Sequence, residues 1–132
     1  MAIKYFKIDD GRVPPHEYLP CGAITPKWGM AMSLSGGKLA AASGAAAPEY
    51  ICMCEYEGAV ADGTLIPVSK VGEDITYLAP LSVSGAALKV GDAVNIAADS
   101  LSVNATTGGA FVITAFHGKA AGDEVEGRFV QI

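Results

Sequence analysis

The chain has 132 residues, of which 51% are hydrophobic and 17% are charged, and its formal net charge at pH 7 is −5. This length suits one ordinary domain or two very small ones. Nine scattered Lys and Arg residues form no basic patch, which excludes nucleic acid as the main partner. No apolar run approaches the ~18 residues of a membrane-spanning helix, so we expect no membrane partner. The low charge favours an oligomer or an assembly component.

Residues 1–26 are predicted to form an extended N-terminal arm. Residues 3–8 favour a short strand, but Pro14, Pro15 and Pro20 remove the backbone donors that a central strand needs. The arm carries exposed apolar groups and a cation, which pack either on its own domain or on a neighbouring chain. We expect a neighbour to bind them, and the candidate partner-binding residues are Tyr5, Phe6, Arg12, Tyr18 and Leu19.

From residue 27 onward the pattern is that of short strands. Met30, Met32 and Leu34 alternate with small residues, which is typical of a half-buried strand. Residues 50–54 are apolar on both faces, as a central strand would be. Residues 65–68 favour an edge strand because they include Pro67. We assign residues 27–84 to a first β unit with its linker.

Residues 85–132 form the second predicted unit, and they repeat the order of the first. Lys27-Trp28-Gly29 is matched by Lys89-Val90-Gly91, at a spacing of 62 residues. The spacing stays at 62 as far as Leu39 and Leu101, and it is 61 from Tyr50 and Phe111 onward. A repeat of this period indicates two copies of one supersecondary unit. The predicted fold is therefore all-β, with two small related units of barrel or sandwich type and an N-terminal arm.

The sequence contains no evident catalytic constellation, so we expect the protein not to be an enzyme. His16 and His117 are the only histidines, and the sequence indicates no partner that would make either a general base. Cys52 and Cys54 share one face of a predicted strand. Packing in the core is the favoured interpretation, and a metal or redox site is the alternative. We therefore expect no metal and no cofactor.

Trp28 lies between the predicted arm and the first strong strand. A single tryptophan packs in a core or serves as an anchor at an interface, where this residue type is enriched. We include Trp28 among the candidate partner-binding residues. The N-terminus lacks the apolar stretch of a secretory signal, and three cysteines in such a chain fit reduced thiols in a cytoplasm.

Several short sequence motifs resemble those of a known protein family. Met32-Ser33-Leu34, Ala61-Asp62-Gly63-Thr64 and Ile66-Pro67-Val68-Ser69-Lys70 resemble the β-rich body of the lambda-like phage head decoration proteins. The phrase Gly91-Asp92-Ala93-Val94 and the stretch 121–125 are similar to a wider group of small β-barrel capsid-stabilising proteins. The resemblance covers roughly residues 24–70 and 88–130.

The resemblance implies a cement protein, made in the host cytoplasm, that binds the outer surface of the mature head of a tailed phage. The partner would be the major capsid protein, and the chain would form a homo-oligomer, with a trimer favoured. The second β unit and the arm sequence differ from the lambda-like pattern. Two alternatives stay open: another virion component, such as a tail or head-fibre base, and a non-viral β-barrel binding or carrier module. The phrase Lys89-Val90-Gly91-Asp92 also resembles the turn of lipoyl domains, which motivates the second alternative.

Overall fold

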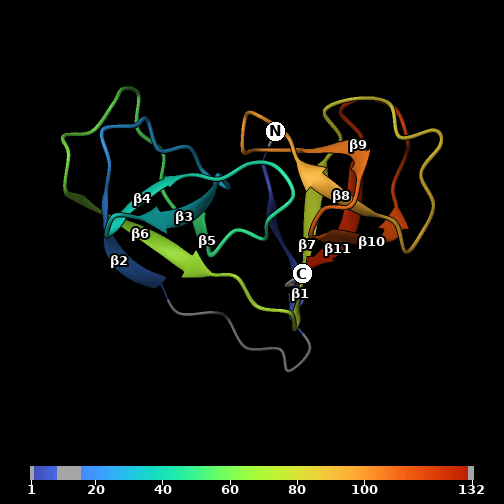
Figure 1. Ribbon diagram of the computed structural model, residues 1–132, viewed down its shortest axis with the longest axis horizontal. Helices are drawn as coiled ribbons and strands as arrows, with labels where there is room; N and C mark the ends of the chain where they lie inside the picture. The colour runs from blue at the N-terminus through green and yellow to red at the C-terminus, as the bar shows by residue number, and fades with distance from the viewer. Residues whose placement is uncertain (1, 9–15, 131–132) are drawn as a thin grey trace.

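The protein is all-β in a computed structural model that describes residues 2–8 and 16–130 (Figure 1). The described residues contain eleven strands and no helix. The strands are β1 (Lys4–Ile8), β2 (His16–Cys21), β3 (Ala31–Ser35), β4 (Lys38–Ala41), β5 (Tyr50–Cys52), β6 (Thr64–Lys70), β7 (Ile75–Pro80), β8 (Ala93–Ile96), β9 (Val103–Thr107), β10 (Phe111–Phe116) and β11 (Glu124–Phe129).

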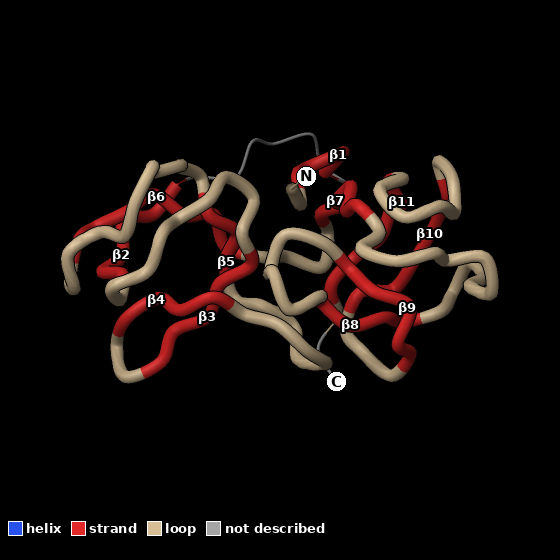
Figure 2. The backbone as a smooth tube through the Cα atoms, turned by 90° about the horizontal axis from the view of Figure 1, so that it is seen from above, coloured by secondary structure: helices blue, strands red, loops and turns tan. Residues whose placement is uncertain are grey.

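The strands form two units, which lie side by side in Figures 1 and 2. Strands β2 to β6 close into a barrel with the order β2-β4-β3-β5-β6. The remaining strands form a six-stranded sheet with the order β1-β7-β11-β10-β8-β9. The prediction of an all-β fold with two small β units is confirmed.

The two units share one topology. Listed from β4, the first unit runs β4-β3-β5-β6-β2, and listed from β9 the second runs β9-β8-β10-β11-β7. Strands β2 to β6 therefore correspond to β7 to β11, one by one and in chain order. Even the closing contact recurs, because Cys21 pairs in parallel with Leu39 and Leu81 pairs in parallel with Val103. The chain thus contains the same five-stranded unit twice.

Individual backbone hydrogen bonds recur as well. The Gly29 N–H donates to the Cys52 carbonyl at 2.9 Å, and the Gly91 N–H donates to the Ile113 carbonyl at 2.8 Å. Both glycines have a positive φ, +80° and +96°, a region that side-chain-bearing residues adopt at a cost. The match of Lys27-Trp28-Gly29 with Lys89-Val90-Gly91 therefore reflects one turn built twice.

The predicted spacing is wrong in register in two places, at β4 against β9 and at β6 against β11, where Pro20 pairs with Leu65 and Pro80 pairs with Glu124. The first hairpin pairs Leu34 with Leu39, and the second pairs Ile96 with Val103. Val103, and not Leu101, is therefore the counterpart of Leu39. The connection in the second hairpin is longer, and the β8–β9 ladder also has a register shift between Val94 and Ile96. Residues added at a hairpin connection or at a register shift change the distance along the chain between equivalent strands, which explains why the spacing is not constant.

The predicted arm differs most from the structure. The residues of 1–26 that the structure describes include β1, which pairs antiparallel with β7, and β2, which pairs antiparallel with β6. They are strands of the two sheets and not a segment laid on a surface. The two units accordingly comprise β2 to β6 and β1 with β7 to β11, so their strands do not follow the predicted boundaries at residues 27 and 85.

The larger of the two cores crosses from one unit to the other. It is centred on Tyr77, Phe111 and Phe129, and it also includes Ala31 and Ile51 of the first unit. Two backbone links cross as well: the Ala31 N–H donates to the Ser100 carbonyl at 2.8 Å, and Gly44 forms an antiparallel bridge with Ile96. The units are therefore packed against each other through apolar side chains and backbone hydrogen bonds.

Candidate partner-binding surface

Two of the predicted partner-binding residues pack on the protein itself. Tyr5 lies against the shared core, with its ring centroid 5.8 Å from that of Tyr77. Burial raises the pKa of the Tyr5 hydroxyl. Leu19 is half-buried against the core of the first barrel. Both side chains therefore have an intramolecular surface to lie on.

Two others are exposed. Tyr18 is 66% exposed on β2, and Trp28 is 48% exposed in the turn before β3. The last two cannot be placed as contacts, because Arg12 and the side chain of Phe6 lie outside the described residues. The structure thus places Tyr18 and Trp28 at different positions on the first unit, one on a strand and one in a turn.

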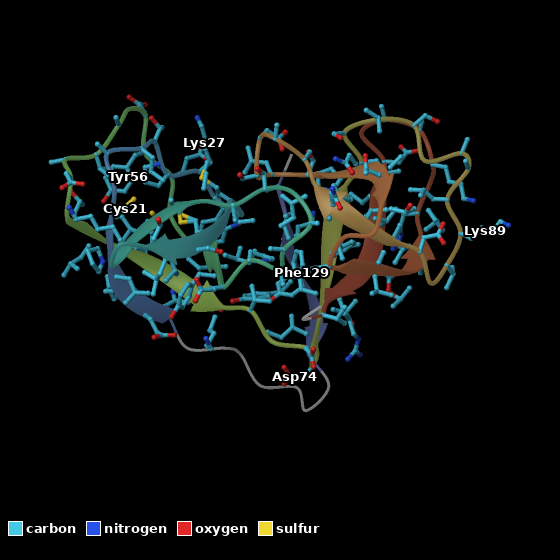
Figure 3. The ribbon with its side chains drawn as sticks, in the orientation of Figure 1. Cys21, Lys27, Tyr56, Asp74, Lys89 and Phe129 are labelled. Carbon is cyan, nitrogen blue, oxygen red and sulfur yellow. The ribbon has the colours of Figure 1, made fainter. Side chains whose placement is uncertain are left out.

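The turn that carries Trp28 is held by the loop that follows β5. The Trp28 N–H donates to a carboxylate oxygen of Glu55 at 3.4 Å, and the Tyr56 N–H donates to the Pro26 carbonyl at 3.0 Å. Tyr56 is itself 40% exposed. Figure 3 shows Lys27, the residue before Trp28, at the outer surface of the first unit. Trp28 therefore stands on a braced turn, which suits an anchor in an interface.

The same turn in the second unit also presents an apolar side chain. Val90 occupies the position of Trp28 and is 64% exposed. Figure 3 shows the neighbouring Lys89 at the far edge of the second unit. Each unit therefore carries one exposed apolar residue between a lysine and a glycine at an equivalent place.

A second exposed apolar group lies on the outer face of the β2–β6 ladder. Tyr18 pairs with Pro67, and Pro20 pairs with Leu65, so these four side chains share one face. Leu65 is 60% exposed. The sequence analysis missed Leu65 because residues 65–68 are apolar at every position, so alternation could not reveal which side chains face outward. Its neighbour Ile66 is fully buried.

The cysteines are placed as core residues. Cys21 and Cys52 are fully buried, and the Cys52 and Cys54 sulfur atoms lie 3.6 Å apart. Burial raises the pKa of all three thiols, and that of Cys52 rises to about 12. In the second unit, the residues at the three equivalent positions are Leu81, Ile113 and Ala115. Apolar side chains occupy these places in the other copy, so the repeated unit folds without sulfur there.

Alkaline pH is expected to test the placement of Cys52. Its folded-state pKa of about 12 exceeds the ordinary value of 9.0, so between these pH values the unfolded chain loses a proton that the folded chain keeps. The free energy of unfolding should therefore fall as pH rises from about 9 to 12. Urea unfolding at stepped pH should show a shallower fall for Cys52→Val. A matched Cys54→Ala variant should flatten the curve less, and equal slopes in all three proteins would contradict this assignment.

His117 has a partner that the sequence did not indicate. Its Nε2 lies 2.7 Å from a carboxylate oxygen of Glu126, across the β10–β11 hairpin. The contact between His117 and Glu126 lies on the surface of the β10–β11 ladder and links the end of β10 to β11. His16 is exposed at the start of β2.

Three observations bear on other kinds of site. Within the described part of the chain, His, Cys, Asp and Glu side chains nowhere gather in a group of three that could hold a metal ion. Over the same residues, no helix is long and apolar enough to cross a bilayer. Comparison of the sequence with protein-family models and with curated protein sequences finds no match.

Proposed function

We propose that this chain is a decoration, or cement, protein that binds the outer surface of a mature phage head and stabilises contacts between major capsid subunits. The proposal rests first on the resemblance of residues 24–70 and 88–130 to head decoration and capsid-stabilising proteins. These two stretches overlap the two repeated units. The protein would be made in the host cytoplasm and act on the virion as a homo-oligomer, with the trimer of the resembled family as the first candidate.

The observation that carries the proposal is the pair of equivalent turns. Trp28 and Val90 are exposed at matching positions, and both turns belong to units joined by a shared core. A clamp needs two attachment points held at a fixed separation, and a duplicated unit provides them. Bivalent docking also makes two weak contacts strong, because the second contact forms at a high effective concentration.

Capsid binding by turn variants tests the proposal. Purified protein is mixed with expanded heads of the parent phage that lack it, and bound protein is measured after sedimentation. We expect Trp28→Ser to weaken attachment roughly tenfold, as loss of an interface tryptophan commonly does. Val90→Ser should weaken it less, and the double variant should lose most of the bound protein because bivalency is lost.

The matched control is Val83→Ser, which changes an apolar residue of the second unit that is 45% exposed but lies outside the repeated turns. It should bind like the unmodified protein. Full occupancy by the Trp28→Ser, Val90→Ser double variant would exclude the turns as the attachment points. Failure of the unmodified protein to bind expanded heads would reject the decoration role itself.

A further inference from the structure

Sulfur-bearing side chains gather in the core of the first barrel. Cys21, Cys52 and Cys54 pack there, together with Met30 and Met32. Figure 3 shows sulfur atoms, in yellow, close to the labelled Cys21 in this unit. The sequence has no cysteine after Cys54, so the second unit builds the same fold without a thiol. The thiols are therefore a property of the first unit alone.

Two of these thiols are in direct contact. The Cys52 and Cys54 Sγ atoms lie 3.6 Å apart, and the Cys52 thiol donates to the Cys54 carbonyl at 3.3 Å. Both cysteines pack in the barrel core, whereas Met53 between them packs in the core that the two units share. The alternation of an extended chain therefore directs both sulfur atoms to the same side.

The main chain between the two cysteines suits a covalent link. Residues two apart in an extended chain have Cα atoms about 6.6 Å apart. This separation is within the range of disulfides, about 4.4–6.8 Å. The sulfur atoms must also approach to about 2.0 Å, which requires a small movement of one side chain. Cys54 lies beyond the end of β5 and outside the β5–β6 ladder, so it is the residue that can move.

The two thiols differ in their access to solvent. Cys52 is fully buried, whereas Cys54 is half-buried. Burial raises the pKa of both thiols, so each is protonated at neutral pH, and reactions that need the thiolate are slow there and faster in alkali. Cys54 is therefore the thiol that a dissolved reagent reaches first, and Cys52 is the neighbour that reacts second.

We propose that Cys52 and Cys54 form a thiol–disulfide exchange site that reacts with small aliphatic disulfides. The Cys54 thiolate attacks one sulfur atom of the reagent, whose S–S bond breaks and releases one thiol after protonation. The Cys52 thiolate then attacks the Cys54 sulfur of the mixed disulfide and displaces the second thiol. The protein loses two protons and two electrons, and the reagent gains both as it becomes two thiols. Excess thiol reverses the reaction.

Equilibration of the full chain with 2-hydroxyethyl disulfide and 2-mercaptoethanol at about pH 8.5, the ordinary pKa of a thiol, tests the proposal. Free thiols are then alkylated, and peptide mass spectrometry locates the disulfide. We expect a disulfide between Cys52 and Cys54, with Cys21 left as the free thiol. Cys54→Ala introduces the residue of the equivalent position, Ala115, and should form no intramolecular disulfide. The matched control Cys21→Ala removes another thiol of the same core and should oxidise as the unmodified protein does.

The same equilibrium in urea separates the effect of the fold from that of closeness in the sequence. We expect the ratio of disulfide to dithiol to be at least about tenfold higher in the folded protein, because the fold holds the two sulfur atoms in contact. An equal or lower ratio in the folded protein would overturn the proposal. A disulfide that includes Cys21, or a folded protein whose three thiols stay free where the unfolded chain is oxidised, would also overturn it. None of these results bears on capsid attachment through Trp28 and Val90.

Discussion

Replacing Gly29 with alanine is expected to lower the free energy of unfolding by about 2–5 kcal/mol. A side chain at φ +80° costs about 1–2 kcal/mol. A Cβ atom at this position would also lie 2.5 Å from the Ile3 carbonyl oxygen and 2.7 Å from the Ala2 Cβ atom. Overpacking of this kind typically adds about 1–3 kcal/mol. Urea unfolding followed by circular dichroism measures the loss.

The repeat supplies the matched control. Gly91 occupies the same turn with φ +96°, but a Cβ there would meet no atom within 4 Å. Gly91→Ala should therefore cost only the backbone term, about 1–2 kcal/mol. The difference between the two variants isolates the contact of the N-terminal residues with the first unit. Equal losses at Gly29 and Gly91 would show that this contact contributes nothing to stability.

Replacing Ile3 with alanine is expected to lower the free energy of unfolding by about 2–5 kcal/mol. Ile3 is fully buried and belongs to the core that the two units share. At roughly 4 °C per kcal/mol, the midpoint of thermal unfolding should fall by about 8–20 °C. Scanning calorimetry of the two proteins measures the shift.

Lys4→Ala is the control from the adjacent position. Lys4 forms a surface ion pair with Glu124 at 3.3 Å, and its side chain is 52% exposed. Such pairs contribute about 0–1 kcal/mol, so the midpoint should move little. If Ile3→Ala left the midpoint unchanged, the N-terminal residues would behave as the separate arm that the sequence analysis predicted.

The repeat was readable from the sequence because its turns demand particular residues. Gly29 and Gly91 both need a positive φ, and the acidic-glycine turns before β6 and β11 also recur. The register of β4 against β9 was not readable, since hairpin connections vary in length without disturbing the ladders. Trp28 could be chosen as a candidate anchor from its residue type alone. Its exposure depends on the fold of the loop beside it.

The prolines misled the assignment of the N-terminal segment. Pro20 lies in β2 and Pro67 in β6, although proline usually marks a sheet edge. The backbone nitrogen of Pro20 faces away from β6. On that side β2 pairs only at Cys21, so the missing N–H removes no hydrogen bond from the β2–β6 ladder. The backbone of Pro67 faces the end of β5, just past Cys52, the last residue of that strand. The Pro67 carbonyl still accepts a hydrogen bond there, from the Met53 N–H. Which side of a strand a missing N–H lies on depends on pairing, and pairing is not encoded by the local sequence.

The pairing of β1 with β7 has a consequence for the order of folding during synthesis. Lys4 finds its partner only when Leu78 has been made, whereas every strand of the first barrel ends by Lys70. At about 5–20 residues per second, translation from one segment to the other takes several seconds. The first barrel can close only in the last part of that interval, the roughly 0.4–2 s between synthesis of Lys70 and of Leu78, before Ile3 and Tyr5 have β7 to pack against. The earliest residues on the ribosome are thus among the last to reach their final neighbours, and a chaperone would meet them first.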